Sequence, residues 1–371
     1  MKTKILFLIH DLAHGGAEKV LVNLVNNMDK TKYDITVMTL FDVGVNRQYL
    51  KKNIRYRYCF KRMFRGNSHI MKIWSPKQLH HRFIKEHYDI EVAYLEGPCA
   101  RIISGCPDQS TKLISWIHIE QHTQSKAAAS FRNYSEAERC YNRFDKIVCV
   151  SETVKQDFTS LIDLKNTPCV LYNTNESNEI IRQSKEEVGD ANFSDSEIKL
   201  IVVGKLIKVK GVDRLLKIIY RLKQEKYPVH LFVLGVGAEE DNLRKYVRDH
   251  ALEKQVDFLG YQTNPYKYVA KCDLFVCGSH AEGFSTAATE ALIVGTPVCT
   301  VEVSGMKEML GYNNEFGIVT KNDDEALYKG IKHLLDDKEL LLHYKIRAEE
   351  RGKTFSTENT VRAVENMLES L

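Results

Sequence analysis

The feature that most constrains the fold is a regular alternation of apolar segments with amphipathic ones. The apolar segments have the length and composition of buried β-strands, and they cover residues 4–10, 34–40, 89–95, 112–118, 146–151, 198–206, 228–235, 255–260, 273–279 and 296–301. Residues 15–28, between the first two, have apolar side chains at helical spacing. Strands that alternate with helices favour parallel sheets with crossover helices, so the sequence predicts an α/β protein.

A polar segment over residues 173–197 separates the strands into two series. A chain of 371 residues is long enough for two domains of ordinary size. We therefore expect two doubly wound domains, over residues 1–175 and 176–355, with a ligand in the cleft between the carboxyl ends of their strands. The amphipathic pattern over residues 356–371 predicts a C-terminal helix.

The amino-terminal segment imitates a signal peptide, because lysines precede an apolar run from Ile5 to Ile9. That run is shorter than the roughly 7–15 apolar residues of a secretory signal and the roughly 20 of a membrane span. The nine cysteines form no C-x-x-C pair, which favours free thiols over disulfides or a zinc site. These features predict a cytoplasmic protein without a metal site.

The positive charge is concentrated in the first half of the chain. The net charge is +4, whereas the first 178 residues alone carry +8. Residues 47–85 contain twelve lysines and arginines, several aromatic residues and no acid. This stretch fits either a peripheral contact with anionic lipid headgroups or an ordinary solvated basic face. Nucleic acid is a weaker interpretation, because the chain as a whole is not strongly basic.

The segment "EGFSTAATE" places Glu282 and Glu290 eight positions apart, across a turn that enters a helix. Gly283 allows the backbone to approach a ligand closely, and the amides of a helix that begins near Ser285 or Thr286 suit a phosphate. Carboxylates beside such a site suit hydroxyl groups, so a nucleotide sugar fits the pattern. The alternative is that Glu282 caps the helix and Glu290 lies on the surface.

Two further turns have the composition of phosphate-binding loops. Gly204 and Lys205 directly follow a predicted strand, and Lys210 precedes the next helix, where ammonium groups can neutralise a leaving diphosphate. The alternative is an exposed basic turn. Near the amino terminus, Gly15 and Gly16 lie between the first strand and the first helix, which is a second close-approach turn.

Together these segments resemble glycosyltransferase family 4, the retaining, metal-independent transferases of the GT-B fold. The resemblance is carried by "GGAEK", "SWIHIEQH", "VGKLIKVKG", "LGVGAEEDNL", "SGMKEMLG" and, most specifically, the acid pair in "EGFSTAATEALIVGTPV". It implies two Rossmann-like domains that face each other across a cleft, the first for the acceptor and the second for the nucleotide-sugar donor. It also implies that the last helix returns to the first domain.

The resemblance assigns a role to the charged residues. Glu282 matches the acid that holds hydroxyls of the donor sugar, and Glu290 the acid that holds the ribose. Lys205 and Lys210 match the basic pair around the diphosphate. The family usually has Arg where this chain has Lys205, so bidentate phosphate binding is lost there and we expect weaker donor binding.

The resemblance also covers neutral positions. Phe284, Ser285 and Thr286 match the loop whose amides meet the sugar and phosphate, and Gly16 matches the first-domain glycine that faces the phosphate. His118 matches the histidine that contacts the transferred sugar. Its alternative is a histidine satisfied by hydrogen bonds at a strand end.

The resemblance predicts transfer of a hexose from a nucleotide sugar, most commonly a UDP-sugar, to a glycan or lipid-linked acceptor, in cell-surface polysaccharide or capsule biosynthesis. The diphosphate itself would take the acceptor proton, so no protein base, cofactor or metal is expected. The alternatives are a non-catalytic GT-B subunit that binds glycan or a partner transferase, and an epimerase or a phosphorylase-like enzyme on the same fold.

Overall fold

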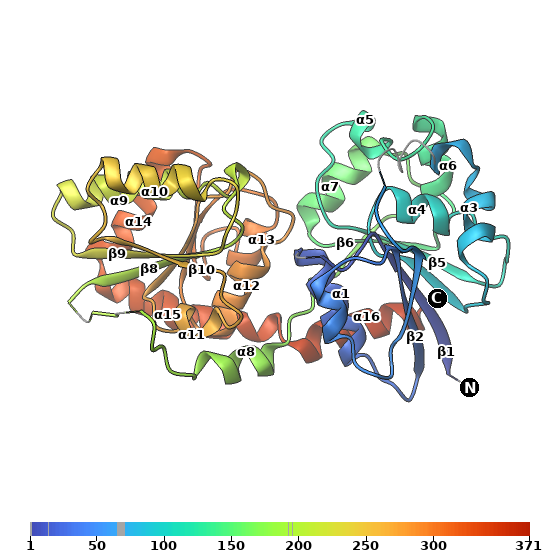
Figure 1. Ribbon diagram of the computed structural model, residues 1–371, viewed down its shortest axis with the longest axis horizontal. Coiled ribbons are helices and arrows are strands. Elements are labelled where there is room, and N and C mark those ends of the chain that lie inside the picture. Colours follow the sequence, from blue (N-terminus) through green and yellow to red (C-terminus); the bar gives the residue numbers. More distant parts are fainter. Residues whose placement is uncertain (1, 14, 65–70, 192, 195) are drawn as a thin grey trace. The chain divides into compact units, whose positions relative to one another are not determined.

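The computed structural model describes residues 2–13, 15–64, 71–191, 193–194 and 196–371. The chain forms two compact α/β units. The first comprises Met1–Asn175 together with Thr357–Leu371, and the second comprises Glu176–Ser356. Each unit contains one parallel sheet with helices connecting its strands (Figure 1). Among the described residues, no helix has the length and apolar character that crossing a bilayer requires.

The sheet of the first unit has seven parallel strands in the order β3-β2-β1-β4-β5-β6-β7. The strands are β1 (Thr3–Ile9), β2 (Tyr33–Phe41), β3 (Arg55–Phe60), β4 (Ile90–Ala93), β5 (Lys112–Ile117), β6 (Lys146–Cys149) and β7 (Cys169–Val170). The helical segments of this unit include α1 (Gly16–Asn27), η1 (Val45–Tyr49), α3 (Pro76–Phe83), α4 (Pro98–Ile103), α5 (Gln124–Ala127), α6 (Tyr134–Tyr141), α7 (Glu152–Leu161) and α16 (Thr357–Glu369).

The last helix, α16, belongs to the first unit although it follows the whole second unit in sequence. Figure 1 shows its red ribbon beside the blue ribbon of α1. Its apolar side chains are buried at helical spacing, and Glu365 accepts a hydrogen bond of 2.6 Å from the backbone amide of Asp29. The amphipathic pattern of the sequence therefore forms a helix that covers part of the first unit.

The sheet of the second unit has six parallel strands in the order β10-β9-β8-β11-β12-β13. The strands are β8 (Ile198–Val203), β9 (Val229–Leu234), β10 (Val256–Gly260), β11 (Leu274–Cys277), β12 (Val298–Val301) and β13 (Ile318–Thr320). The helical segments of this unit are α8 (Ser177–Ser184), η2 (Lys208–Lys210), α9 (Val212–Gln224), α10 (Glu240–Asp249), α11 (Tyr266–Val269), α12 (Thr286–Ile293), α13 (Met306–Leu310), α14 (Asp324–Asp336) and α15 (Lys338–Thr354).

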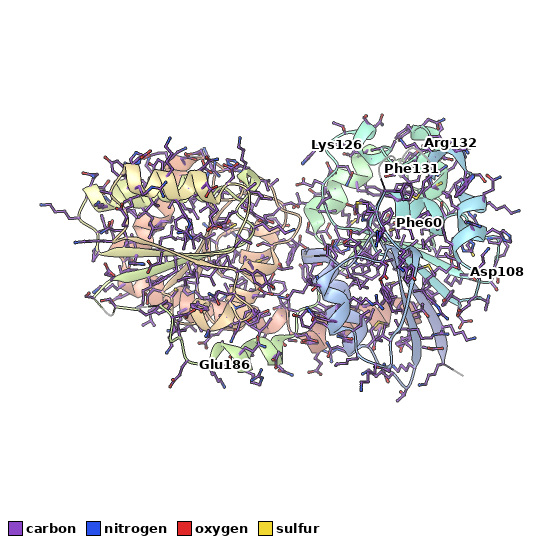
Figure 2. The ribbon with its side chains drawn as sticks, viewed as in Figure 1. Phe60, Asp108, Lys126, Phe131, Arg132 and Glu186 are labelled. Carbon is purple, nitrogen blue, oxygen red and sulfur yellow. The ribbon has the colours of Figure 1, made fainter. Side chains whose placement is uncertain are left out.

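The basic stretch contributes to the folded first unit. Its strand β3 forms the edge of the sheet. Phe60, labelled in Figure 2, lies at the end of β3 and packs against Phe41 and Phe83. Arg55 pairs with Asp34 and with Glu86, at 3.1 and 3.4 Å. Acids outside the stretch therefore compensate part of its charge. Residues 65–70 of the stretch lie outside the described residues.

The structure confirms the α/β class and the ten predicted strands, and it adds three that the sequence did not predict, β3, β7 and β13. All nine cysteines are free thiols, as predicted, and seven of them are buried.

Candidate functional site

The candidate donor site of the second unit lies where the strand order changes direction. After β8 the chain builds β9 and β10 on one side, and then returns to place β11 on the other side of β8. In open parallel sheets, ligands bind at the carboxyl ends of the strands at such a switch point. The loops that follow β8 and β11 carry Gly204, Lys205, Lys210 and the acid of the "EGF" turn.

The loops after β8 and β11 are joined by backbone contacts. The amide of His280 donates a hydrogen bond of 2.7 Å to the carbonyl of Val209. Gly211 has φ +60°, and a Cβ atom at this position would lie 2.0 Å from the carbonyl oxygen of Gly278. Only glycine fits this approach without strain. The two loops therefore hold their side chains in a fixed relation.

Glu282 and Lys210 meet in this pair of loops. The Nζ atom of Lys210 lies 2.7 and 2.8 Å from the two carboxylate oxygens of Glu282. The hydroxyl of Ser279 donates to Oε1 of Glu282 at 2.7 Å. The Glu282 side chain is only 10% exposed, so both contacts are shielded from solvent. The structure thus joins a candidate sugar-binding carboxylate directly to a candidate diphosphate-binding cation.

Helix α12 begins directly after this turn. Ser285 is its N-cap and accepts a hydrogen bond of 3.4 Å from the amide of Ala288, and Thr286 is the first helical residue. Phe284 is buried against Phe355, with ring centroids 5.7 Å apart. Packing of Phe284 thus anchors the turn at the amino end of α12, where a helix offers amides to an anion.

The turn before α12 also packs closely against the residue that precedes α13. A Cβ atom on Gly305, which has φ +76°, would lie 2.9 Å from the carbonyl oxygen of Gly283. This close contact leaves no room for a side chain at Gly305 and fixes the backbone of the "EGF" turn next to the start of α13.

Glu290 lies inside α12 and is 7% exposed. The hydroxyl of Tyr266, in α11, donates to its Oε1 atom at 3.3 Å. The carboxylate is therefore not on the open surface, in contrast to the alternative prediction from spacing alone. Lys205 is exposed and forms no ion pair within the part of the chain that the structure describes. It remains available to an anionic ligand.

Two residues of this site were missed by sequence reasoning. One is Ser279, described above. The other is Arg214 in α9, which is 5% exposed, donates to the carbonyl of Gly278 at 3.1 Å and pairs with Asp324 at 2.9 Å. Its partners are 64 and 110 positions away in sequence, so no local pattern signals the contact. The only signal is an arginine close after the "KVKG" turn.

The first unit carries a second group of candidate residues at the carboxyl ends of β1 and β5. Gly15 is the N-cap of α1 and Gly16 its first residue. The carboxylate of Glu18 lies against Gly15, where a Cβ atom would be 1.8 Å from Oε2. The Glu18 carboxylate therefore occupies the space next to Gly15 that a side chain at residue 15 would take.

His118 directly follows β5 and is 7% exposed. Its ring lies against Tyr94, with centroids 5.0 Å apart. Burial lowers the pKa of His118 to about 4, and a hydrogen bond with the backbone of Tyr94 opposes this shift. The Nε2 atom is buried without a hydrogen-bond partner among the described residues. His118 is thus a neutral imidazole with an unsatisfied ring nitrogen, not the satisfied histidine of the alternative interpretation.

Two other groups of the first unit have the composition of metal ligands. One is buried and consists of His80, Glu91 and Cys106, and the other consists of Glu120, His122 and Asp157. In the first group, Nε2 of His80 hydrogen-bonds to Glu91 at 2.8 Å. In the second, the carboxylate of Asp157 accepts hydrogen bonds from the amides of residues 121 and 122. These hydrogen bonds already engage one carboxylate of each group.

Comparison with known proteins assigns the two units to one kind of enzyme. The sequence model described as Glycosyl transferases group 1 matches residues 167–351, and that described as Glycosyltransferase Family 4 matches residues 14–174. The solved structure of Anabaena HepE in complex with UDP is similar over 100% of both chains, with a TM-score of 0.79 and 19% identity.

Two curated relatives come from bacterial glycan synthesis. One is the N-acetylgalactosamine-N,N'-diacetylbacillosaminyl-diphospho-undecaprenol 4-alpha-N-acetylgalactosaminyltransferase of Campylobacter jejuni, 27% identical over 364 residues and 94% of both proteins. The other is the lipopolysaccharide core biosynthesis glycosyltransferase LpsE of Rhizobium meliloti, 29% identical over 150 residues, which are 40% of this chain and 42% of LpsE. With the two family models matched in succession and a parallel, Rossmann-like sheet in each unit as in GT-B enzymes, this chain belongs to the family 4 glycosyltransferases of group 1.

Proposed function

We propose that this glycosyltransferase transfers a hexose, with retention of anomeric configuration, from a UDP-sugar to a glycan or lipid-linked acceptor in cell-surface polysaccharide biosynthesis. The observation that carries the proposal is the contact between Glu282 and Lys210 at the switch point of the second sheet. UDP as the nucleotide is supported by the UDP complex of the similar HepE structure. A lipid-linked acceptor is supported by the diphospho-undecaprenol substrate in the name of the Campylobacter jejuni relative.

The proposed chemistry follows from charge. Cleavage of the bond between sugar and diphosphate leaves negative charge on the diphosphate. Lys205 and Lys210 would stabilise that charge together with the amides at the start of α12. Glu282 would then exchange part of its contact with Lys210 for hydroxyls of the donor sugar, since a carboxylate accepts several hydrogen bonds at once. Glu290 would accept hydrogen bonds from the ribose.

The first test measures donor binding. A thermal-shift comparison of UDP, GDP and ADP, followed by their sugars, should show the largest stabilisation with UDP and its sugars, because ligands that bind the folded state raise the melting temperature. A larger shift with GDP or ADP would mean that the donor carries that nucleotide and not UDP. No shift with any nucleotide would argue for a non-catalytic GT-B subunit.

The second test asks whether the acid pair is catalytic. Glu282→Gln keeps the shape of the side chain but removes its charge. We expect at least a 100-fold loss of sugar transfer in a folded protein, since each hydrogen bond to a charged group contributes about 1.5–3 kcal/mol and the carboxylate would accept more than one. Glu302→Gln changes an exposed acid that follows β12 and should retain activity. Near wild-type sugar transfer by Glu282→Gln would show that the charge of Glu282 is not needed for catalysis.

Retention and independence of metals are tested in the same assay. Proton NMR of the product should show the anomeric configuration of the donor, and activity should persist in EDTA. Inversion, or loss of activity that Mg²⁺ or Mn²⁺ restores, would contradict these parts of the proposal.

We also propose peripheral contact of the first unit with anionic membrane, through the basic stretch 47–85. Within it, Tyr49, Tyr58, Met63 and Ile73 are exposed, with Ile73 at 71%. Exposed apolar and basic side chains on one segment suit a lipid surface. Co-sedimentation with liposomes that contain phosphatidylglycerol should occur at low salt and weaken at high salt. Equal binding to neutral liposomes, or none at low salt, would count against the contact.

A further inference from the structure

A histidine and an aspartate directly after β1 form a contact to which the proposed chemistry gives no role. Strand β1 ends at Ile9 and lies between β2 and β4, so His10 is at the carboxyl edge of the first sheet, where ligands of parallel sheets bind. Its Nδ1 atom lies 2.7 Å from Oδ2 of Asp11. The other carboxylate oxygen, Oδ1, accepts a hydrogen bond of 2.8 Å from the amide of Ala13. Both oxygens of Asp11 are therefore engaged.

The second ring nitrogen of His10 is open to a ligand. The side chain of His10 is 34% exposed. Its Nε2 atom is in contact with solvent and has no hydrogen-bond partner among the described residues. Because a carboxylate only accepts hydrogen bonds, the contact with Asp11 places the imidazole hydrogen on Nδ1. In the neutral ring, Nε2 is then a hydrogen-bond acceptor that faces solvent.

Aromatic side chains from the neighbouring strands lie beside His10. Its ring packs against Phe41 at the end of β2, with centroids 5.1 Å apart. Phe41 in turn stacks on Phe60 at the end of β3, at 5.7 Å, and Phe60 lies 5.2 Å from Phe64. Phe41 is buried, whereas Phe60 and Phe64 are only half-buried. An aromatic surface thus continues from His10 along the carboxyl edge of β1, β2 and β3.

The loops that carry this edge are bound to each other. The amide of Leu12 donates to the carbonyl of Val43 at 3.0 Å, and the amide of Asn46 donates to the carbonyl of Leu12 at 3.0 Å. Gly44 has φ +124°, and a Cβ atom there would lie 1.9 Å from the carbonyl carbon of Leu12. The loops after β1 and β2 therefore hold His10 in place before a ligand binds.

We propose that His10 binds a hydroxyl group of the acceptor sugar, that the sugar packs against the aromatic side chains beside it, and that Asp11 is a positioning residue for His10. This inference rests on the proposed function, to which it adds a contact for the acceptor. A lone pair at Nε2 selects a hydroxyl donor, and aromatic rings suit the C–H groups of a sugar ring. A neutral imidazole offers no charge to a diphosphate, so this contact suits the acceptor sugar and not the charged part of the donor.

The first variant is His10→Phe, which keeps a ring against Phe41 but removes both nitrogens. The probes are UDP-glucose or UDP-N-acetylglucosamine as donor and octyl glycosides of glucose, galactose and N-acetylgalactosamine as acceptors. The KM for the acceptor should rise about tenfold, because a hydroxyl of the bound sugar loses its partner. The KM for the donor and kcat should change little.

The matched control is His87→Phe. His87 also lies next to a carboxylate, with Nδ1 at 3.1 Å from Asp108, but it precedes β4 and so lies at the opposite edge of the sheet. This variant should keep the wild-type KM for both substrates. An unchanged acceptor KM in His10→Phe, or a rise in the KM for the UDP-sugar in place of that for the acceptor, overturns the proposal.

Asp11→Asn tests the positioning role. The amide oxygen of the asparagine can still accept from Ala13, which leaves its NH₂ group facing Nδ1 and moves the imidazole hydrogen to Nε2. The acceptor KM should then rise as in His10→Phe, although the histidine is still present. The double variant should be no worse than His10→Phe alone, because both changes remove the same contact. Additive losses would mean that Asp11 acts on the fold and not through His10.

If the wild type transfers to none of the glycosides, saturation-transfer difference NMR with the same glycosides and UDP decides. Binding that is lost in His10→Phe and kept in His87→Phe supports the inference, whereas equal binding or no binding by the wild type overturns it. The thermal shift with UDP keeps the two proposals apart. A UDP shift without glycoside binding rejects only the role of His10, whereas no shift with any nucleotide rejects the proposed function itself.

Discussion

At the scale of single residues, the candidate donor site is organised around the carboxylate of Glu282. Lys210 balances its charge and Ser279 binds Oε1, while the thiol of Cys277 donates to the Ser279 hydroxyl at 3.4 Å. Ser279 is 1% exposed, so its hydroxyl cannot turn to solvent. The serine therefore restricts the directions that the carboxylate can take before a donor arrives.

Ser279→Ala should weaken catalysis without unfolding the protein. Loss of a hydrogen bond to a charged group costs about 1.5–3 kcal/mol, so kcat/KM for sugar transfer should fall roughly 10- to 100-fold. Ser279→Thr retains the hydroxyl and should recover part of the loss. Kinetics with the preferred donor checks this. A variant with wild-type kcat/KM would show that Lys210 alone fixes Glu282.

The sequence predicted part of the candidate site because strand ends can be located from apolar patterns. Lys210 and Glu282 each follow a predicted strand, and the two strands proved to be neighbours. Ser279 and Arg214 were not predicted, since serine and arginine are common at loops and helix surfaces. Their importance comes from contacts with residues that only the folded chain brings close, such as the Gly278 carbonyl for Arg214.

Two buried histidines of the first unit should make its stability depend on pH in opposite directions. Burial opposes protonation of His80, but hydrogen bonds with Cys106 and Glu91 outweigh it and raise the pKa of His80 to about 9. His80 therefore stabilises the fold fully below about pH 6.5, and this contribution is lost as the pH rises towards 9. The lowered pKa of His118, about 4, gives a contribution that is present above 6.5 and lost as the pH falls towards 4.

The first unit should therefore be most stable near pH 6.5, with each histidine contributing up to about 3 kcal/mol. Both tryptophans of the chain, Trp74 and Trp116, lie in this unit, so their fluorescence during urea unfolding reports on it. His80→Gln should flatten the alkaline side of the profile, while the same change at the neighbouring exposed His81 should not. If the stability of His80→Gln still falls at alkaline pH, groups other than His80 cause that fall.

At the scale of elements, the sequence predicted strands whose apolar residues are continuous and missed those without such a run. Strand β3 has the sequence RYRYCF and lies at the sheet edge, where basic side chains remain exposed and the apolar signal is weak. Strands β7 and β13 have two and three residues, too few for a periodic pattern. Helix α12 was predicted correctly because its cap, Ser285, is followed by small and apolar helix-forming residues.

Helix α14 offers a test of capping away from the candidate site. Asp323 is its N-cap and accepts a hydrogen bond of 2.7 Å from the amide of Ala326. Asp323→Ala should lower the free energy of unfolding by about 1 kcal/mol, because one amide of the first turn loses its partner. Asp323→Asn can still cap and should cost less. Urea denaturation followed by circular dichroism compares the variants, and equal stability of Ala and Asn would contradict the assignment.

At the scale of the whole molecule, the chain enters the second unit after Asn175 and leaves it before Thr357, so the first unit is completed last. The hydroxyl of Thr357 donates to the carbonyl of Asn175 at 2.6 Å, which joins the two crossing points of the chain. Helix α16 then buries Val361, Val364, Met367 and Leu368. The stability of the first unit should depend on this helix, whereas that of the second should not.

Val364→Ala tests this dependence with the nine free cysteines as reporters. Removal of two buried methyl groups should cost the first unit about 2 kcal/mol. In mild urea, a thiol reagent should then label the cysteines of the first unit faster than in the wild type: Cys59, Cys99, Cys106, Cys140, Cys149 and Cys169. The cysteines of the second unit should keep their wild-type rates: Cys272, Cys277 and Cys299.

Peptide mass spectrometry after labelling distinguishes the two sets, and Asn366→Ala, on the exposed face of α16, provides the control. The two sets differ in sequence position but share one chain, so a difference between them reports on the units and not on the amount of reagent. Faster labelling of both sets in Val364→Ala would mean that the units unfold together. Unchanged labelling of both would mean that the packing of α16 contributes little to the first unit.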